Sequence, residues 1–346
     1  MQKDLAAPYL PAALQGGRHL RHPLETDRRI DTLVRRAASA TSPTDGSSSA
    51  LRAGVQSIPK IGSSPGRRRT ALDFLVSLSA DLARGHVNVP GFPNVVMKIG
   101  VALDHPETSV DGTVRVVGEE PRLAARLLQA ANSAAFNPTG ARVRELRTAI
   151  TRLGRPLVQG VTMAFAIQQM RDEPSLRSIS NDSKAIWGKS IVVASLSRLL
   201  ACRTKVKPDE AFLAGLLHGI GRLYIMARAV GNLSASGLGA ECADLTATLH
   251  PSIGKALLEN WRVGGGIPES VGDQANYGRD EGEADLTDVL IVGIVLAEAL
   301  GRAPLGRSQV EGISSFRRID LTLQECHTTL THAEYHLAAL HQALGC

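Results

Sequence analysis

The chain has 346 residues, of which 43% are hydrophobic and only 3% are aromatic, and its formal net charge is +6. A core of this composition must be mostly aliphatic, and aromatic platforms for stacking nucleic-acid bases are scarce. No CxxC pair occurs among the cysteines, which argues against a zinc knuckle or a disulfide framework and fits a reducing cytoplasm. The cysteines are Cys202, Cys242, Cys326 and Cys346.

No segment has the pattern of a signal peptide or a membrane span. The first residues, MQKDLAAPYL, lack the charged and then apolar layout of a secretory signal. The longest apolar run, residues 289–297, has about half the length that a membrane helix needs. The sequence therefore predicts a cytoplasmic protein without membrane contact.

Positive charge is concentrated near the N-terminus, where residues 1–70 hold 12 Lys and Arg against 5 Asp and Glu. From Ser39 to Thr70, 15 of 32 residues are Ser, Gly or Pro, a composition that buries too little apolar surface to order the chain. We expect residues 1–70 to be a disordered basic arm and linker, with one short helix over 27–38. The cluster Arg67, Arg68 and Arg69 could contact nucleic acid or an acidic partner, although a solvated tail is the preferred interpretation.

Apolar residues recur at helical spacing from about residue 71 onward. Residues 121–134 place Leu123, Leu127, Leu128 and Ala131 on one stripe, and Pro121 suits a first helical turn. The segment 286–300 is apolar nearly all round, which predicts a buried helix. No segment shows the alternation of a strand, so the predicted class is all-α. Further helices are predicted over 186–203, 211–227, 251–262 and about 321–344.

Three glycines interrupt the apolar pattern LAGLLHGIGRLYI of residues 213–225. They are Gly215, Gly219 and Gly221, and each costs a helix about 1 kcal/mol relative to alanine. Close approach of neighbouring helices would offset this cost, because a missing side chain lets two backbones pack tightly. The stretch is therefore predicted to be a tightly crossed central helix.

Several segments together resemble the HDOD family (HD-related output domain) over about residues 72–301. The resembling segments are VPGFPNVVMKI (89–99), VVGEEPRLAARLLQAANSAAF (116–136), TAITRLG (148–154), GLLHGIGRLYI (215–225) and HPSIGKALLENWRVGGGIPESV (250–271). The resemblance implies an N-terminal helical bundle joined to an HD-like five-helix bundle. It also implies an output module of bacterial signal transduction that acts by binding another protein, whose identity the sequence does not reveal. The domain is expected over 71–303, followed by a loop and C-terminal helix over 304–346.

The family's motif residues are expected to be structural. Asn132 is an unusual polar residue in a helix of alanines and leucines, and we expect it to hydrogen-bond the backbone of the next loop. The VGGG run at 263–266 is interpreted as a lengthened loop between helices. The motif residues in question are Asn132, Ser133, Gly154, Trp187, Gly221, Gly254 and Trp261.

The resemblance also places a degenerate HD site. In working HD enzymes an early His, a His-Asp pair and a late Asp converge on one or two metals. Here Lys189 stands at the early His, His218 keeps the second His, Gly219 replaces its Asp partner, and Glu298 takes the place of the late Asp. No catalytic residue, metal or other cofactor is therefore predicted. We expect His218 to bond a helix carbonyl or Glu298, and an anion held by Lys189 and His218 is the alternative.

Two other functions remain open at this stage. One is a divergent metal-dependent phosphohydrolase of nucleotides or cyclic dinucleotides that uses His218, His250 and Glu298. The other is a nucleotide- or nucleic-acid-binding regulator that uses the basic arm and Lys189.

His332 and His336 have the i, i+4 spacing of zinc ligands but no evident third ligand, so a solvated helix face is expected.

Overall fold

A computed structural model divides the chain into two units, residues 1–62 and 63–346. The predicted arm, the short helix over 27–38 and the Arg67–Arg69 cluster lie outside the described residues. The structure describes residues 74, 77–78, 80–82, 84, 94–104, 109–137, 139–230, 240–279, 282–300 and 305–344.

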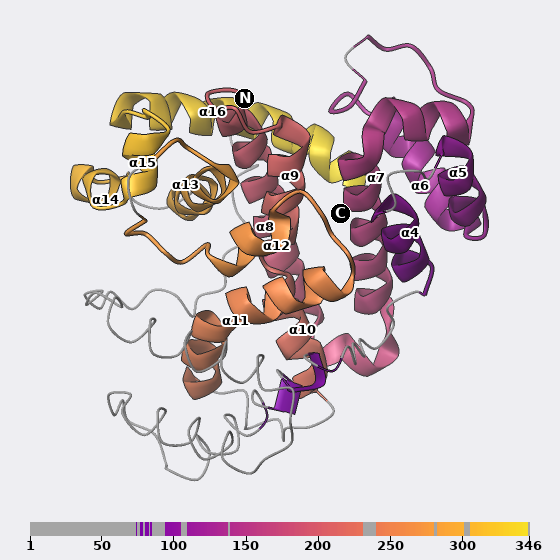
Figure 1. Cartoon of the computed structure of the whole chain (residues 1–346), viewed down its shortest axis with the longest axis horizontal. Coiled ribbons are helices and arrows are strands. Elements are labelled where there is room, and N and C mark those ends of the chain that lie inside the picture. Colours follow the sequence, from indigo (N-terminus) through magenta and orange to yellow (C-terminus); the bar gives the residue numbers. More distant parts are fainter. Residues whose placement is uncertain are drawn as a thin grey trace, which may run out of the picture. The chain divides into compact units, whose positions relative to one another are not determined.

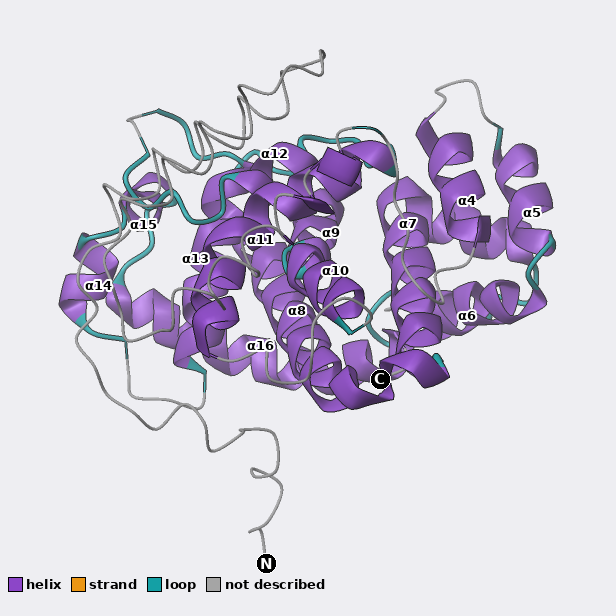
Figure 2. Ribbon diagram, turned by 90° about the horizontal axis from the view of Figure 1, so that it is seen from below, coloured by secondary structure: helices purple, strands orange, loops and turns teal. Residues whose placement is uncertain are grey.

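The described residues form helices and no strands (Figures 1 and 2), which confirms the predicted all-α class. The elements are α4 (Asn94–Asp104), α5 (Val110–Gly118), α6 (Pro121–Asn132), α7 (Leu146–Asp172), the 3-10 helix η2 (Pro174–Ile179), α8 (Ser180–Ala201), α9 (Pro208–Leu217), α10 (Ile220–Ala229), α11 (Ala240–Asn260), α12 (Ile267–Gly272), α13 (Leu286–Ala299), α14 (Arg307–Glu311), α15 (Ser314–Arg318) and α16 (Leu323–Leu344).

Helices α4, α5 and α6 pack against α7 and form the N-terminal bundle. The predicted stripe of α6 is buried at Leu123, Leu127 and Ala131, and Pro121 occupies the first turn as expected. Helix α7 is kinked at Gly154, whose φ of 70° and ψ of 170° belong to a region that essentially only glycine adopts. The glycine of the TAITRLG segment is therefore required by the backbone.

Helices α8 to α13 form the second bundle, and α7 joins the two bundles by packing against α9. The predicted buried helix is α13, which starts with a capping box between Asp285 and Asp288. The start predicted for α8 is wrong, because the helix begins at Ser180, following η2 without a break. Trp187, close to the predicted start, consequently lies in mid-helix and is buried.

The segment 211–227 is two helices and not the single helix predicted from its apolar pattern. Helix α9 ends at Leu217 and α10 begins at Ile220, with His218 and Gly219 at the break. The pattern continues through the break because both helices are buried on nearly every face, so apolar periodicity carries no signal of the turn.

The close backbone approach predicted for the three glycines is confirmed at Gly215 and Gly221, whereas Gly219 lies at the break between the helices. A β-carbon on Gly215 would lie 2.6 Å from the α-carbon of Ala194 in α8. A β-carbon on Gly221 would lie 2.0 Å from the backbone oxygen of His250 and 2.8 Å from the nitrogen of Gly254, both in α11. Gly215 and Gly221 thus allow α9 and α10 to touch the backbones of two different neighbours.

The C-terminal segment differs from the predicted loop and single helix, since α14 and α15 precede α16. Phe316 and Ile319 pack in one buried cluster with Leu196 of α8 and with Val292 and Leu296 of α13. The segment therefore shares a core with the second bundle. None of the helices in the described part of the chain is long and apolar enough to cross a membrane.

Candidate functional site

A pocket of about 140 Å³ lies between α8, α10, α11, α13 and the loop that follows α12. The structure brings the four residues of the expected degenerate HD site to this pocket. They are joined there by His250, which the phosphohydrolase alternative includes, and by residues that the sequence did not connect with them. The lining comprises Ile186, Lys189, His218, Gly219, Arg222, Ala247, His250, Pro251, Gln274, Ala275, Tyr277, Ile294 and Glu298.

His218 is buried at the break between α9 and α10, and its Nδ1 lies 2.8 Å from the carbonyl oxygen of Gly215. Since a carbonyl oxygen only accepts, Nδ1 carries the hydrogen. Burial lowers the pKa of His218 to about 3, and the positive charges of Lys189 and Arg222 act in the same direction. His218 is therefore neutral at pH 7, and the expected bond to a helix carbonyl is present.

Lys189 and Glu298 face each other across the pocket, with Nζ 2.8 Å from Oε1. Glu298 thus pairs with Lys189 rather than with His218. Arg222 adds a second positive charge, and within the described part of the chain no carboxylate lies at ion-pair distance from it. Burial lowers the pKa of Arg222, yet a guanidinium remains charged at any physiological pH. The two cations outnumber the single carboxylate of the lining.

His250 lies on α11 with only 6% of its surface exposed. Its Nδ1 is buried and has no hydrogen-bond partner among the residues that the structure describes. Burial lowers the pKa of His250 well below its ordinary value, and Arg222, His218 and Lys189 lower it further. The pocket therefore contains a neutral imidazole with one unsatisfied nitrogen, an arrangement that is costly unless something else pairs with it.

The residues present do not fit a catalytic metal centre. The His218 tautomer would suit a metal ligand, because metal-bound histidines usually donate their other ring N–H to a backbone carbonyl or carboxylate. However, Gly219 offers no side-chain ligand, Lys189 would repel a cation, and Glu298 is engaged by Lys189. Among the described residues, no group of three or more His, Cys, Asp or Glu is placed to hold a metal ion.

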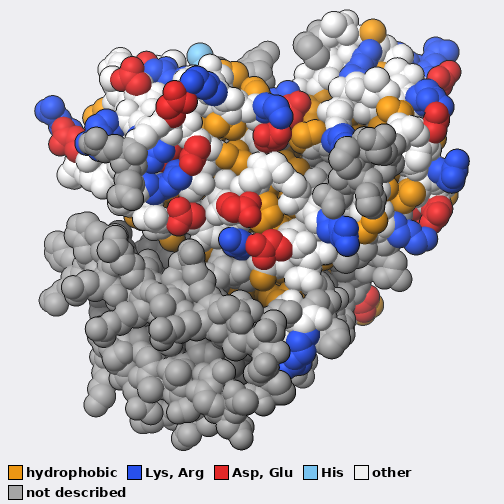
Figure 3. Space-filling view, in the orientation of Figure 1, with side chains coloured by type: hydrophobic (Ala, Val, Ile, Leu, Met, Phe, Trp, Pro, Cys, Tyr) orange, Lys and Arg blue, Asp and Glu red, His pale blue; other side chains and the backbone are white. Residues whose placement is uncertain are grey.

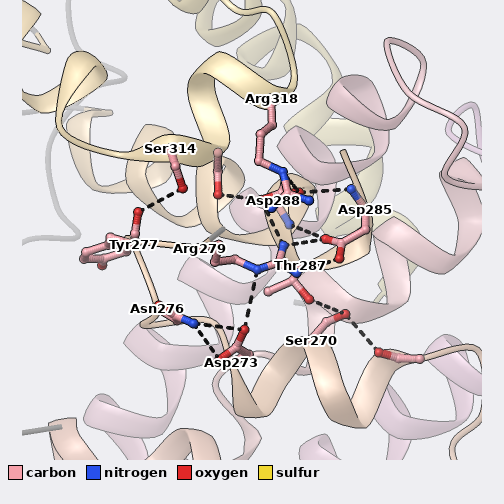
Figure 4. Close-up of polar contacts among 12 residues, drawn as sticks. Ser270, Asp273, Asn276, Tyr277, Arg279, Asp285, Thr287, Asp288, Ser314 and Arg318 are labelled. Carbon is pink, nitrogen blue, oxygen red and sulfur yellow. Dashed lines mark hydrogen bonds and ion pairs between the residues drawn. The ribbon is translucent and has the colours of Figure 1, made fainter. Parts of the chain in front are cut away.

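A network of ion pairs holds the loop between α12 and α13 that forms one wall of the pocket (Figure 4). Asp288 is fully buried, and its carboxylate lies 2.9 Å from Arg279 and 3.1 Å from Arg318. Ser315 donates to the same carboxylate at 2.8 Å. Arg279 also makes two 2.6 Å bonds to Asp285. The loop is therefore tied both to α13 and to the C-terminal segment.

Two residues of this loop reach the pocket. The side-chain amide of Gln274 donates to the backbone oxygen of His218 at 3.1 Å, which ties the loop to the α9–α10 break. The backbone oxygen of Tyr277 accepts bonds from the amide and the hydroxyl of Ser314. Sequence reasoning did not single out Gln274 or Tyr277, because only the folded chain brings them beside His218.

The remaining predicted residues lie away from the pocket. Asn132 donates to the Val143 oxygen at 2.8 Å and accepts from the Val143 nitrogen at 2.7 Å, so the expected contact with the next loop is present. The hydroxyl of Ser133 donates to Ala130. His332 is exposed on α16, as predicted, whereas the side chain of His336 lies outside the described residues.

Residues after α11 form the loop that the VGGG run predicts. Gly265 and Gly266 there have positive φ values of 76° and 71°, which glycine adopts without strain. Trp261 is buried, and its backbone oxygen would lie 2.6 Å from a β-carbon on Gly100 of α4. Gly265 and Gly266 thus lie at a turn, and Trp261 lies at a packing contact.

Comparison with known proteins relates this chain to the HDOD domain. The profile of the HDOD domain matches residues 89–277. An uncharacterized protein of Treponema pallidum (strain Nichols) is 23% identical over 211 residues, which are 56% of this chain and 38% of that protein. The chain therefore spans well under half of this relative's length.

Solved structures show the same fold. A proposed metal-dependent phosphohydrolase from Shewanella amazonensis SB2B is 19% identical, with a TM-score of 0.56 over 77% of this chain and 99% of that one. A proposed signal transduction protein from Marinobacter aquaeolei VT8 is 19% identical, with a TM-score of 0.53 over 81% of this chain and 66% of that one. An HDOD domain protein from Geobacter sulfurreducens is also 19% identical, with a TM-score of 0.52 over 80% of this chain and 98% of that one. At such identities the likeness concerns the fold alone.

Proposed function

This chain belongs to the HDOD family, and we propose that it is a non-catalytic regulatory protein of bacterial signal transduction that acts by binding another protein. The observation that carries the proposal is the composition of the pocket. Where HD enzymes gather metal ligands, this chain has the Lys189–Glu298 ion pair, a glycine at position 219, and Arg222, with which no carboxylate of the described residues pairs. The helical framework is retained, while two of the four ligand positions hold Lys189 and Gly219, which supply no metal ligand.

The charge on one face of the described residues agrees with a protein partner better than with nucleic acid. On the face drawn in Figure 3, acidic and basic side chains are interspersed over the described residues. Nucleic-acid binding depends on phosphate neutralisation by a continuous basic surface, and this face offers none. In this proposal the family domain spans 71–303, residues 304–346 complete its core, and a contribution of the arm at Arg67–Arg69 is secondary.

The first experiment measures metal content and hydrolysis together. The full chain, produced with manganese, iron and zinc in the medium, is expected to retain far less than one metal per chain. It is expected to leave bis(p-nitrophenyl) phosphate and cyclic dinucleotides intact. The matched variant is His218→Ala, which should behave like the wild type in both assays.

A different result would support a divergent phosphohydrolase, for which His218, His250 and Glu298 at one pocket are the available ligands. That result is about one or two bound metals per chain, together with hydrolysis that His218→Ala abolishes. It would overturn the non-catalytic role.

The protein-binding role itself is tested by reciprocal co-purification from cells. One partner must recover the chain and must also be recovered by it. Failure in both directions would reject the role.

A further inference from the structure

We propose that the pocket between α8, α10, α11 and α13 binds a single phosphate group, either free inorganic phosphate or the phosphate of a small phosphomonoester. This inference goes beyond the protein-binding role and does not depend on it. It rests on three features of the pocket, which are its uncompensated charge, an unpartnered buried imidazole and its size.

Charge is the first feature. Arg222 presents a planar guanidinium with five N–H donors, a geometry that matches two phosphate oxygens at once. No carboxylate among the described residues pairs with it, so its charge is available to a ligand. Lys189 is paired with Glu298, but this bond uses only one of the three ammonium N–H groups. The carboxylate of Glu298 would repel an anion, but Lys189 and Arg222 together carry two positive charges. The net charge of the pocket lining is therefore positive.

The unpartnered imidazole is the second feature. His250 is more than nine-tenths buried and lines the pocket, and its Nδ1 finds no partner within the described part of the chain. The Nδ1 atom is closed to solvent, so the imidazole must turn toward the pocket before it can donate a hydrogen to a phosphate oxygen. Buried polar atoms without partners are rare in folded proteins, and a bound ligand is one accepted reason for their presence. With its ring turned in this way, His250 would be satisfied by an anion beside Arg222.

Size is the third feature, and it limits the ligand. The pocket volume of about 140 Å³ corresponds to roughly ten water molecules when each needs about 10–15 Å³. A phosphate group displaces only a few waters and fits within this space. Pockets for drug-sized ligands typically measure about 300–1,000 Å³, so a cyclic dinucleotide would exceed it. The geometry points to one phosphate rather than a whole nucleotide.

The test is isothermal titration calorimetry of the full chain with inorganic phosphate and, separately, with glycerol 3-phosphate. Chloride keeps the ionic strength constant, because surface charge effects depend on salt. Saturable binding is expected for the wild type, with Arg222→Gln weakening it at least tenfold. The matched control is Arg307→Gln, which removes an equal charge from an exposed arginine of α14 that does not line the pocket, and it should bind like the wild type.

Several results would overturn the proposal. The first is the absence of saturable heat with either compound. The second is that Arg222→Gln binds phosphate as tightly as the wild type. The third is that Arg307→Gln weakens binding as much as Arg222→Gln does. Tighter binding of a cyclic dinucleotide than of phosphate would overturn the assignment to a single phosphate. If Arg222→Gln does not fold, as judged by circular dichroism, Lys189→Met takes its place with the same expected loss. Preference for glycerol 3-phosphate would identify a phosphomonoester, and equal or better binding of inorganic phosphate would identify the free ion.

Discussion

Gly221 and His250 approach so closely that a β-carbon at position 221 would lie 2.0 Å from the His250 carbonyl oxygen. The obstructing atom belongs to backbone, so no rotation of a side chain could relieve the clash. Gly221→Ala must push α10 and α11 apart, and we expect it to lower the free energy of unfolding by about 3 kcal/mol. Urea denaturation followed by circular dichroism measures this change.

Gly188 supplies the control for this experiment. It lies in α8, and a β-carbon built on it would meet nothing within 4 Å. Gly188→Ala should therefore stabilise the chain by about 1 kcal/mol through helix propensity alone. Effects of the same sign from both substitutions would contradict the close crossing at Gly221.

The buried neutral state of His218 predicts that stability falls in mild acid. The unfolded chain binds a proton at this residue below its ordinary pKa of 6.5, whereas the folded chain does so only near pH 3. Between pH 7 and pH 5.5 the free energy of unfolding should drop by about 1 kcal/mol from this residue alone. The loss continues until the pH approaches 3.

The comparison variant is His218→Asn, which offers an N–H for the Gly215 oxygen but does not titrate. His250 remains in both proteins, so its own contribution cancels between them. Urea midpoints at pH 7 and pH 5.5 should therefore differ less in the variant. An identical pH dependence of the two proteins would show that His218 is not held neutral.

Removal of the Asp288 carboxylate should be strongly destabilising. Arg279 and Arg318 both pair with it, and Arg318 is only 11% exposed at its side chain. Loss of one partner from a buried ion pair typically costs about 3–5 kcal/mol, because the remaining charge is left uncompensated. Asp288→Ala is expected to lower the free energy of unfolding by about this amount in thermal or urea denaturation.

Asp285 provides the contrast, because its side chain is 48% exposed. Burial alone would raise the pKa of Asp285, but hydrogen bonds from Arg279 and the Asp288 backbone lower it to about 2. With the exposure taken into account, Asp285→Ala should cost about 1 kcal/mol at pH 7. Its contribution is lost as the pH falls from 3.8 toward 2. A larger loss for Asp285→Ala than for Asp288→Ala would contradict this ranking.

Asn132 is expected to stabilise the loop between α6 and α7 through its paired bonds with the Val143 backbone. Asn132→Ala should cost about 1–2 kcal/mol, since each hydrogen bond contributes about 1 kcal/mol. The control is Asn276→Ala, because the Asn276 amide bonds the exposed Asp273 and no other described residue. Native-state hydrogen exchange at Val143 should quicken in Asn132→Ala alone, and unchanged protection would refute this role.

The sequence predicted those features that depend on local chemistry. The apolar stripe of α6, the burial of α13 and the tight packing at Gly215 and Gly221 all follow from residue type and spacing. The break at His218 was missed because the helices on both sides are buried and their apolar pattern does not change across it. The short helices α14 and α15 were missed because five residues are too few for a periodic signal.

The site was predicted only as far as family motifs reach. Lys189, His218, Gly219 and Glu298 occupy the positions of the expected degenerate site, and the structure places them at one pocket. Arg222 was missed although it directly follows Gly221, because a lone arginine in a helix has no spacing pattern. The position of His250 beside it depends on the crossing of α10 and α11, which no local rule contains.

The pocket lining is drawn from residues spread over 186–298, and one of its walls is tied through Tyr277 to the C-terminal segment. No partly folded form of the chain can contain it, since its walls come together only with the complete bundle. Any molecule that occupies the pocket therefore adds its binding free energy to the stability of the whole, about 2.7 kcal/mol at one hundred times its dissociation constant. The resistance of the chain to proteolysis should consequently rise and fall with the concentration of that molecule in the cell.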